Sequence, residues 1–157
     1  ALISSRAGLP CEDGEIYDEN IRILLKEQSR LECFRLECIS DPFVHFRVIL
    51  NSDAGTENLI FLSSKEMGVY EEGYNGHVHL GVLLDSRLRI LDIMIIEHHE
   101  TQGFIDYIME SGFIEDIKNN PEIQKVDAVS GATLSSQAIK NAVLRCLDRY
   151  RKEIMDQ

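Results

Sequence analysis

A run of small and hydroxyl-bearing residues stands directly before the strongest helical pattern of the chain. Residues 127–136 read Asp-Ala-Val-Ser-Gly-Ala-Thr-Leu-Ser-Ser. The small side chains of Ser130, Gly131 and Ala132 let a ligand approach the backbone closely. Three hydroxyl groups follow, on Thr133, Ser135 and Ser136. Unpaired N–H groups and the positive end of the dipole attract anions at a helix start, so the stretch predicts a phosphate site; an ordinary N-cap at either of the last two serines is the alternative.

The helix that follows is expected to hold this turn in place. Apolar residues recur at helical spacing along one broad face, at Ala138, Ile139, Ala142, Val143, Cys146, Leu147, Tyr150 and Ile154. Basic residues gather toward its C-terminal end, at Arg145, Arg149, Arg151 and Lys152. Cations interact favourably with the negative pole of a helix dipole. The positive pole, near Thr133 to Ser136, is thereby left for an anion.

The run resembles the flavinylation motif of the FMN-binding domain family. This domain occurs in peripheral subunits of the sodium-pumping NADH:quinone oxidoreductase and the Rnf complex, and in regulators of nitrous-oxide and organohalide respiration. The motif is Asp, two variable residues, Ser or Thr, Gly, Ala, then Thr or Ser, and the chain meets every position. The resemblance implies that a flavin transferase esterifies the phosphate of FMN to Thr133. It also implies that the surrounding residues bind the phosphate, namely Ser130, Gly131, Ala132, Leu134, Ser135 and Ser136.

Asp127 opens the motif, and two roles stay open for it. An Asp before a turn can accept hydrogen bonds from the backbone N–H groups of that turn. It can equally serve recognition by the modifying enzyme.

A second block of sequence resembles the same family. Gly73-Tyr74-Asn75-Gly76 resembles its Gly-Tyr-x-Gly strand, and residues 97–103 resemble its His-x-Glu-Thr-Pro-Gly segment. Gln102 stands where Pro is usual, and Phe104 departs from the common Leu-Gly continuation. The resemblance implies contacts to the flavin ring from Tyr74, Gly76, His98, Glu100, Thr101 and Gly103. It covers about residues 70 to 147, and residues 1–40 match nothing in the family.

Histidines and cysteines offer alternative chemistry. His77 and His79 share one face of a predicted strand and His98 adjoins His99, so a four-histidine metal site is conceivable. This spacing is not a recognised closed ligand set, and we predict no bound metal. The four cysteines form no Cys-x-x-Cys pair, which argues against an iron–sulfur or zinc-ribbon site. Buried thiols are favoured, and the spacing selects none of the three possible disulfide connectivities.

Composition restricts the class of protein. The chain has 157 residues, a net charge of −11 and a pI of about 4.8. Nucleic acid and anionic lipid require a basic surface, so neither is an expected partner. No apolar run approaches the ~20 residues that span a bilayer. The sequence begins with Ala1 and shows no signal peptide, which fits an excised or processed piece.

Periodicity predicts an α+β fold. Residues 1–17 read as a poorly ordered leader, and residues 18–157 as a single FMN-binding domain. Helices are predicted at about 18–29, at 104–109 before Gly112, and from residue 133 onward. Strands are predicted at 43–50, 59–62, 78–84 and 88–96. Together they predict an antiparallel sheet of two hairpins with helices packed on one side and a long C-terminal helix.

The resemblance implies three possible functions. The first is an electron-transfer flavoprotein domain with FMN on Thr133, a redox-carrier subunit rather than a stand-alone enzyme. It would work in a membrane-associated, extracytoplasmic chain with membrane redox partner subunits, although this chain has no span of its own. The second is a redox-sensing regulatory module that binds FMN for a membrane partner. The third, a reductase of a small substrate, would require a dedicated substrate pocket or a further domain.

Overall fold

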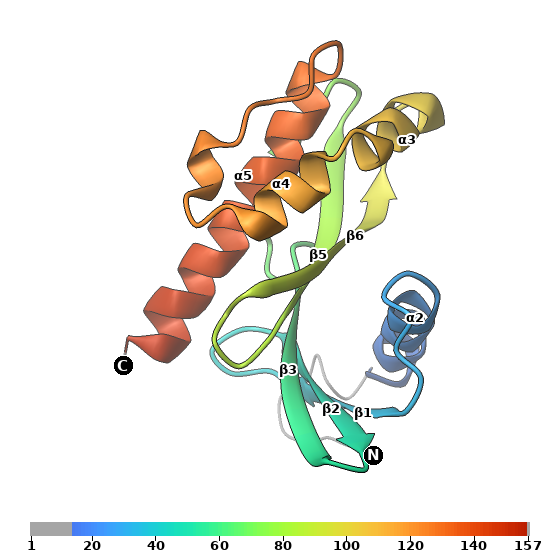
Figure 1. Ribbon diagram of the computed structural model, residues 1–157, viewed down its shortest axis with the longest axis vertical. Coiled ribbons are helices and arrows are strands. Elements are labelled where there is room, and N and C mark those ends of the chain that lie inside the picture. The colour runs from blue at the N-terminus through green and yellow to red at the C-terminus, as the bar shows by residue number, and fades with distance from the viewer. Residues whose placement is uncertain (1–13, 157) are drawn as a thin grey trace.

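A six-stranded antiparallel sheet forms the centre of the computed structural model, which describes residues 14–156 (Figure 1). The strands are β1 (Phe34–Ile39), β2 (His45–Ser52), β3 (Gly55–Ser63), β4 (Glu71–Glu72), β5 (His77–Leu84) and β6 (Ile90–His98). The first three strands form a meander, and β3 then pairs with β5. β6 lies along one edge of β5, while β3 and β4 share the other edge.

Four α-helices of the described chain surround the sheet: α2 (Gly14–Glu27), α3 (Gln102–Glu110), α4 (Phe113–Asn119) and α5 (Thr133–Tyr150). Gly112 separates α3 from α4 in a left-handed conformation, with φ of 89°. A short 3-10 helix, η1 (Ile123–Lys125), precedes the turn before α5, and a π-helical segment, η2 (Arg151–Met155), continues α5. Among residues 14–156, no helix is long and apolar enough to cross a membrane.

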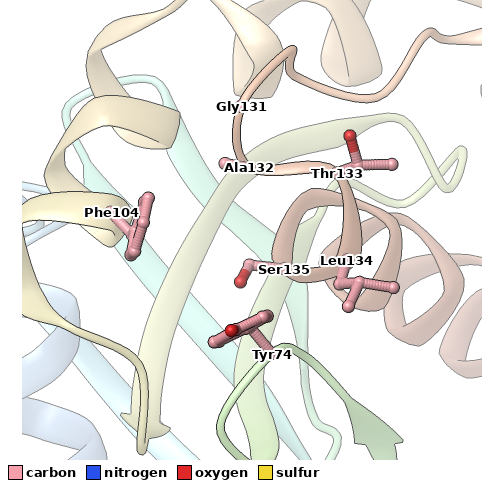
Figure 2. Close-up of a pocket in the computed structure, with 7 residues that line it drawn as sticks. All are labelled: Tyr74, Phe104, Gly131, Ala132, Thr133, Leu134 and Ser135. Carbon is pink, nitrogen blue, oxygen red and sulfur yellow. The ribbon is translucent and has the colours of Figure 1, made fainter.

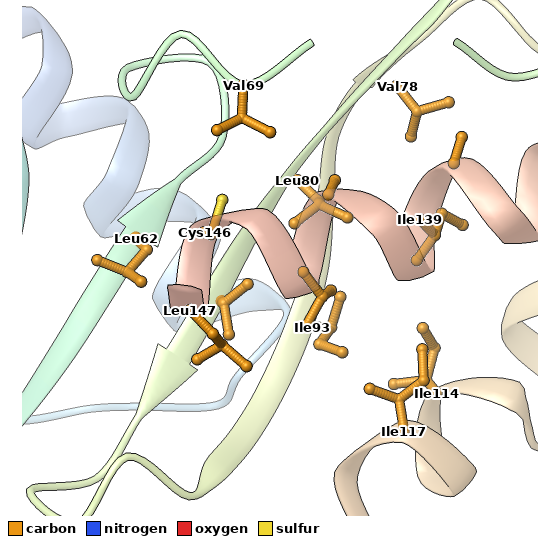
Figure 3. Packing of buried hydrophobic residues seen from close by; sticks show 14 of the residues in the cluster. Leu62, Val69, Val78, Leu80, Ile93, Ile114, Ile117, Ile139, Cys146 and Leu147 are labelled. Atoms are coloured by element: carbon orange, nitrogen blue, oxygen red, sulfur yellow. The ribbon is translucent and has the colours of Figure 1, made fainter. Parts of the chain in front are cut away.

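The two faces of the sheet carry separate apolar clusters, because successive strand residues point to opposite faces. On β5, Val82 and Leu84 belong to the cluster beneath α3, α4 and α5, whereas Leu83 belongs to the cluster beneath α2. Figure 3 shows the first cluster, in which Ile139 of α5 and Ile117 of α4 lie near strand residues. The strand pattern therefore places α5 firmly against the sheet.

The α+β class, the antiparallel sheet and the long C-terminal helix are confirmed. The sheet has two strands that we did not predict, β1 and the two-residue β4. Helices α3 to α5 share one face as predicted, but α2 packs on the other face through Ile21 and Leu25. The first predicted helix begins at Gly14 rather than residue 18, and residues 1–13 of the predicted leader lie outside the described residues.

The cysteines play different parts. Cys38 is disulfide-bonded, whereas Cys33 and Cys146 are free thiols. Cys11 lies outside the described residues. Burial raises the pKa of Cys146 to about 12, so this thiol behaves as an apolar core residue of α5.

Candidate functional site

A cavity of about 420 Å³ lies at the start of α5 (Figure 2). Three segments far apart in sequence contribute to its wall: the loop before β5, the first turn of α3, and the loop that enters α5. The lining residues are Tyr74, Phe104, Gly131, Ala132, Thr133, Leu134 and Ser135. Sites for small molecules and cofactors commonly enclose ~300–1,000 Å³, so this hollow has the size of a cofactor site.

The first turn of α5 leaves its N–H groups open. Ala132 is the N-cap residue and makes no side-chain cap hydrogen bond. The helical ladder begins where the N–H of Ser136 donates to the carbonyl of Ala132, at 2.9 Å. We predicted open N–H groups at 134–137, and the structure moves this set to 133–135, because α5 begins at Thr133. Thr133 is exposed, and its hydroxyl accompanies these donors.

The two serines of the first turn of α5 are structural. Ser136 is fully buried; its hydroxyl accepts from the N–H of Val129 at 2.9 Å and donates to the carbonyl of Thr133 at 3.2 Å. The hydroxyl of Ser135, also buried, donates to Glu100. Neither serine caps the helix, which excludes the ordinary N-cap alternative. Gly131 adopts φ of 85°, a conformation that glycine reaches without strain, and so lets the loop turn into α5.

Glu100 is a buried carboxylate behind the cavity. It is 6% exposed and accepts hydrogen bonds from the N–H groups of Tyr74 and Asn75, both at 2.6 Å, in addition to the bond from Ser135. Burial acts to raise the pKa of Glu100, but these hydrogen bonds and nearby His98 outweigh it, so the pKa lies below its usual value. Glu100 therefore remains ionised at neutral pH.

Aromatic and apolar side chains form an exposed rim around the cavity. Tyr74 is 71% exposed and Leu134 53% exposed, while Phe104 and Tyr107 on α3 are also largely in solvent. Tyr107 donates from its hydroxyl to the carbonyl of Ser130, at 3.2 Å, and so connects α3 to the motif loop. A planar apolar ligand would cover this rim.

Sequence reasoning missed Phe104 as a wall residue and Tyr107 as a tether. Their spacing of three residues places both on one side of a helix, and both interrupt an otherwise polar surface. That pattern could have pointed to them, although only the structure shows what lies opposite.

Other residues assigned to the ring side lie outside the cavity lining. Gly76 packs against His99, since a Cβ there would lie 3.3 Å from that ring. Thr101 is exposed at the start of α3 and makes no side-chain cap hydrogen bond. Gly103 is also exposed, and a Cβ built on it meets nothing within 4 Å. The buried Nδ1 of His98 lacks a hydrogen-bond partner among the described residues.

Asp127 lies away from the cavity. It is exposed and lines a separate hollow beside α4, together with Asp116 and Lys125. Within residues 14–156, the structure shows no hydrogen bond from its carboxylate to the turn. This placement favours the recognition role over the turn-stabilising one.

The histidines of β5 stack with an aromatic residue rather than surround a metal-sized space. The Tyr70 ring lies 5.3 Å from the rings of both His77 and His79. Burial lowers the pKa of His79, so its neutral form is favoured. In the described part of the chain, no group of three or more His, Cys, Asp or Glu side chains is placed to hold a metal ion.

The fold and the cavity define an α+β domain with a ligand site at the start of its last helix. Residues 73–148 match the family model of the FMN-binding domain, which confirms the resemblance and identifies this region as an FMN-binding domain. The match begins at the loop that carries Tyr74 and extends through most of α5. It thus contains every residue that lines the cavity.

Curated relatives come from three strains of Haemophilus influenzae, PittEE, Rd and 86-028NP, and each is the G-type component of the ion-translocating oxidoreductase complex. Each is 33% identical to this chain over 89 residues, which cover 47% of this chain and 43% of the relative. The chain thus spans less than half the length of these relatives.

Proposed function

We propose that this protein is an electron carrier whose FMN is joined through its phosphate to Thr133. The observation that carries the proposal is an exposed hydroxyl at the uncapped start of α5, beside a cavity with an aromatic rim. The residues present fit the group. Open N–H groups at 133–135 suit the phosphate, and the exposed faces of Tyr74 and Phe104 suit the isoalloxazine ring. When bound, FMN supplies reversible transfer of one or two electrons.

Attachment requires a second protein. Within the described residues, no general base is hydrogen-bonded to the Thr133 hydroxyl, and a threonine needs such a base to attack phosphorus. We assign this step to a flavin transferase that uses a flavin dinucleotide. A bond forms between Thr133 Oγ and the flavin phosphorus while the anhydride bond to the second nucleotide breaks. That nucleotide leaves with the electron pair, and the hydroxyl proton passes to a base of the transferase. Asp127, exposed near the motif, is the residue we assign to recognition by this enzyme.

The cellular setting follows from the relatives. Their name assigns them to an ion-translocating oxidoreductase complex, and we propose that this domain exchanges electrons with membrane subunits of a comparable assembly. We place it on the extracytoplasmic side. The disulfide at Cys38 supports this placement, because disulfides persist in oxidising compartments. Covalent attachment would retain the cofactor where the cytoplasm cannot replace it.

Intact mass after co-expression with a flavin transferase tests the proposal. The wild-type chain should gain the mass of one FMN minus one water and give a fluorescent band after denaturing electrophoresis. Thr133→Ala should show neither and remain folded, since the exposed hydroxyl supports no hydrogen bond within residues 14–156. Thr133→Ser should retain partial attachment, because the nucleophilic oxygen survives.

Ser130→Ala is the matched control, since it removes an exposed hydroxyl three residues away and leaves intact the carbonyl that accepts from Tyr107. This variant should load fully. A full equivalent of denaturation-resistant flavin on Thr133→Ala, or a label mapped to Ser130 or Ser136, would overturn the assignment.

A further inference from the structure

Two walls of the flavin site meet at one side chain that does not itself line the cavity. Glu100 receives hydrogen bonds from the loop that carries Tyr74 and from Ser135 in the first turn of α5. We propose that Glu100 is a positioning residue, whose buried carboxylate fixes the Tyr74 loop against the start of α5 and so sets the environment of the flavin ring. This inference rests on the proposed function and adds a role that a wall residue would not have.

The bonding pattern requires a carboxylate. Oε1 accepts from both the N–H of Tyr74 and the hydroxyl of Ser135, while Oε2 accepts from the N–H of Asn75. All three partners are donors, so both oxygens must act as acceptors. A glutamine offers only one acceptor oxygen, and its NH₂ group would face a donor. A protonated carboxyl has the same conflict.

The loop is shaped to admit this carboxylate. A Cβ on Gly73 would lie 2.1 Å from Oε1 of Glu100, far inside van der Waals contact. The N–H of Gly73 also donates to the carbonyl of Gly76 at 2.8 Å, which closes the loop on itself. Gly73 thus serves as the space for the carboxylate, and this accounts for the first glycine of the Gly-Tyr-Asn-Gly segment.

Two consequences for the cofactor follow. Tyr74 is 71% exposed and has little packing of its own, so its position over the cavity depends on the backbone bonds to Glu100. The carboxylate also places a fixed negative charge behind Ser135. Reduction adds electrons to the flavin, so a nearby negative charge opposes it and lowers the reduction potential.

Glu97→Gln provides a matched control. Glu97 lies three residues before Glu100 and carries the same charge, but its side chain is exposed and pairs with Lys65 at 2.7 Å. Replacing it removes one charge from the same region without touching the cavity or the Tyr74 loop.

Amide hydrogen exchange on the flavin-free chain tests the positioning role alone. Glu100→Gln and Gly73→Ala, which displaces the carboxylate sterically, should each speed exchange at the amides of Tyr74 and Asn75 by about tenfold or more, because a hydrogen bond to a charged group is lost. Glu97→Gln should leave both rates unchanged. Wild-type rates in the folded Glu100→Gln and Gly73→Ala variants would overturn the proposal.

Redox titration and fluorescence of the loaded chain test the effect on the flavin. Glu100→Gln should shift the reduction potential upward, toward that of a site without the charge. Its flavin fluorescence should rise toward that of Tyr74→Ala, in which the stacking ring is absent. Glu97→Gln should match the wild type in both measurements.

The two proposals fail separately. If the wild type loads FMN but Glu100→Gln keeps its potential and fluorescence, the positioning role is wrong and the proposed function stands. If the wild type takes up no flavin, the proposed function is wrong, and hydrogen exchange still decides whether Glu100 holds the loop.

Discussion

The two ends of α5 are built for different purposes. At the N-terminal end, the first turn has no side-chain cap, and the hydroxyl of Thr133 stands exposed beside a cavity. At the C-terminal end, the basic side chains have partners. Arg145 donates to the carbonyl of Tyr70 at 3.0 Å and pairs with Glu71, and Arg149 donates to the carbonyl of Met67.

This contrast shows where the domain keeps its binding capacity. A helix end with all its groups satisfied contributes to stability and offers nothing to a ligand. An end with open donors contributes less to stability and binds an anion instead. The same helix therefore fixes the fold at one end and offers the phosphate site at the other.

A carboxylate placed at the open end should produce the largest effect. Leu134→Asp puts a negative charge among the open N–H groups, where it occupies the anion site and repels a phosphate. We expect covalent flavin to fall at least about tenfold, since ~1.4 kcal/mol of repulsion suffices for that factor. The free energy of unfolding of the flavin-free chain should stay constant or rise by about 0.3–1 kcal/mol, because the charge suits the dipole.

Gln137→Asp is the control for this charge, as it lies one turn further along α5 on an exposed position. It should load flavin normally. Equal loading of the Leu134→Asp variant, measured by intact mass, would show that the open end is not the phosphate site.

The satisfied end should respond in stability alone. Arg149→Ala removes the bond to Met67, the 2.7 Å pair with Glu153 and the contact of the guanidinium with the Phe43 ring, 4.6 Å from its centroid. We expect the free energy of unfolding to fall by about 1.5–3 kcal/mol, as for hydrogen bonds to charged groups. Flavin loading should be unchanged.

Urea denaturation measures this loss, and Arg151→Ala is the comparison, because Arg151 is exposed two residues along. That change should stay within about 0.5 kcal/mol. A flavin defect in the folded Arg149→Ala variant would mean that the two ends are coupled.

Acid should weaken the open end through Glu100. Its pKa is lower in the folded protein than in the unfolded chain. The stability that it contributes is therefore fully present above the unfolded value, about 4.3 for Glu, and is lost as the pH falls through the folded value. Burial lowers the pKa of His45 and His79, so these residues reduce stability already below about pH 6.5.

Comparison with Glu100→Gln separates the two effects. Wild type should be the more stable above about pH 5, and the difference should shrink as the pH falls below about 4.3, because the carboxyl then protonates. Thermal unfolding between about pH 3 and pH 7 measures it. A constant difference over this range would show that the carboxylate charge contributes nothing.

The smallest effect is expected at Gly103, in the first turn of α3. A Cβ there meets nothing within 4 Å, so Gly103→Val should fold normally and load flavin fully. If the ring extends toward α3, the added side chain should alter the absorption envelope or the reduction potential. Spectra and potential identical to those of the wild type would place the ring on the Tyr74 side instead.

The parts of this protein that depend on local pattern could be predicted from its sequence. The apolar periodicity from Ala138 onward predicted α5, and alternation with turn residues predicted both hairpins. The motif at 127–136 predicted the FMN-binding family, because closely spaced residues form the turn. β1 escaped prediction although Phe34–Ile39 alternates, since its pairing with β2 depends on the sheet as a whole.

The assembly of the site depends instead on tertiary packing. Glu100 bonds to Tyr74 across 26 positions and to Ser135 across 35, and no local pattern encodes such partners. Packing also brings Phe104 and Tyr107 to the border of the cavity and buries Ser136 in the turn. Periodicity reports which face of an element is apolar, whereas the partner of a buried polar group is fixed by the packing of distant segments.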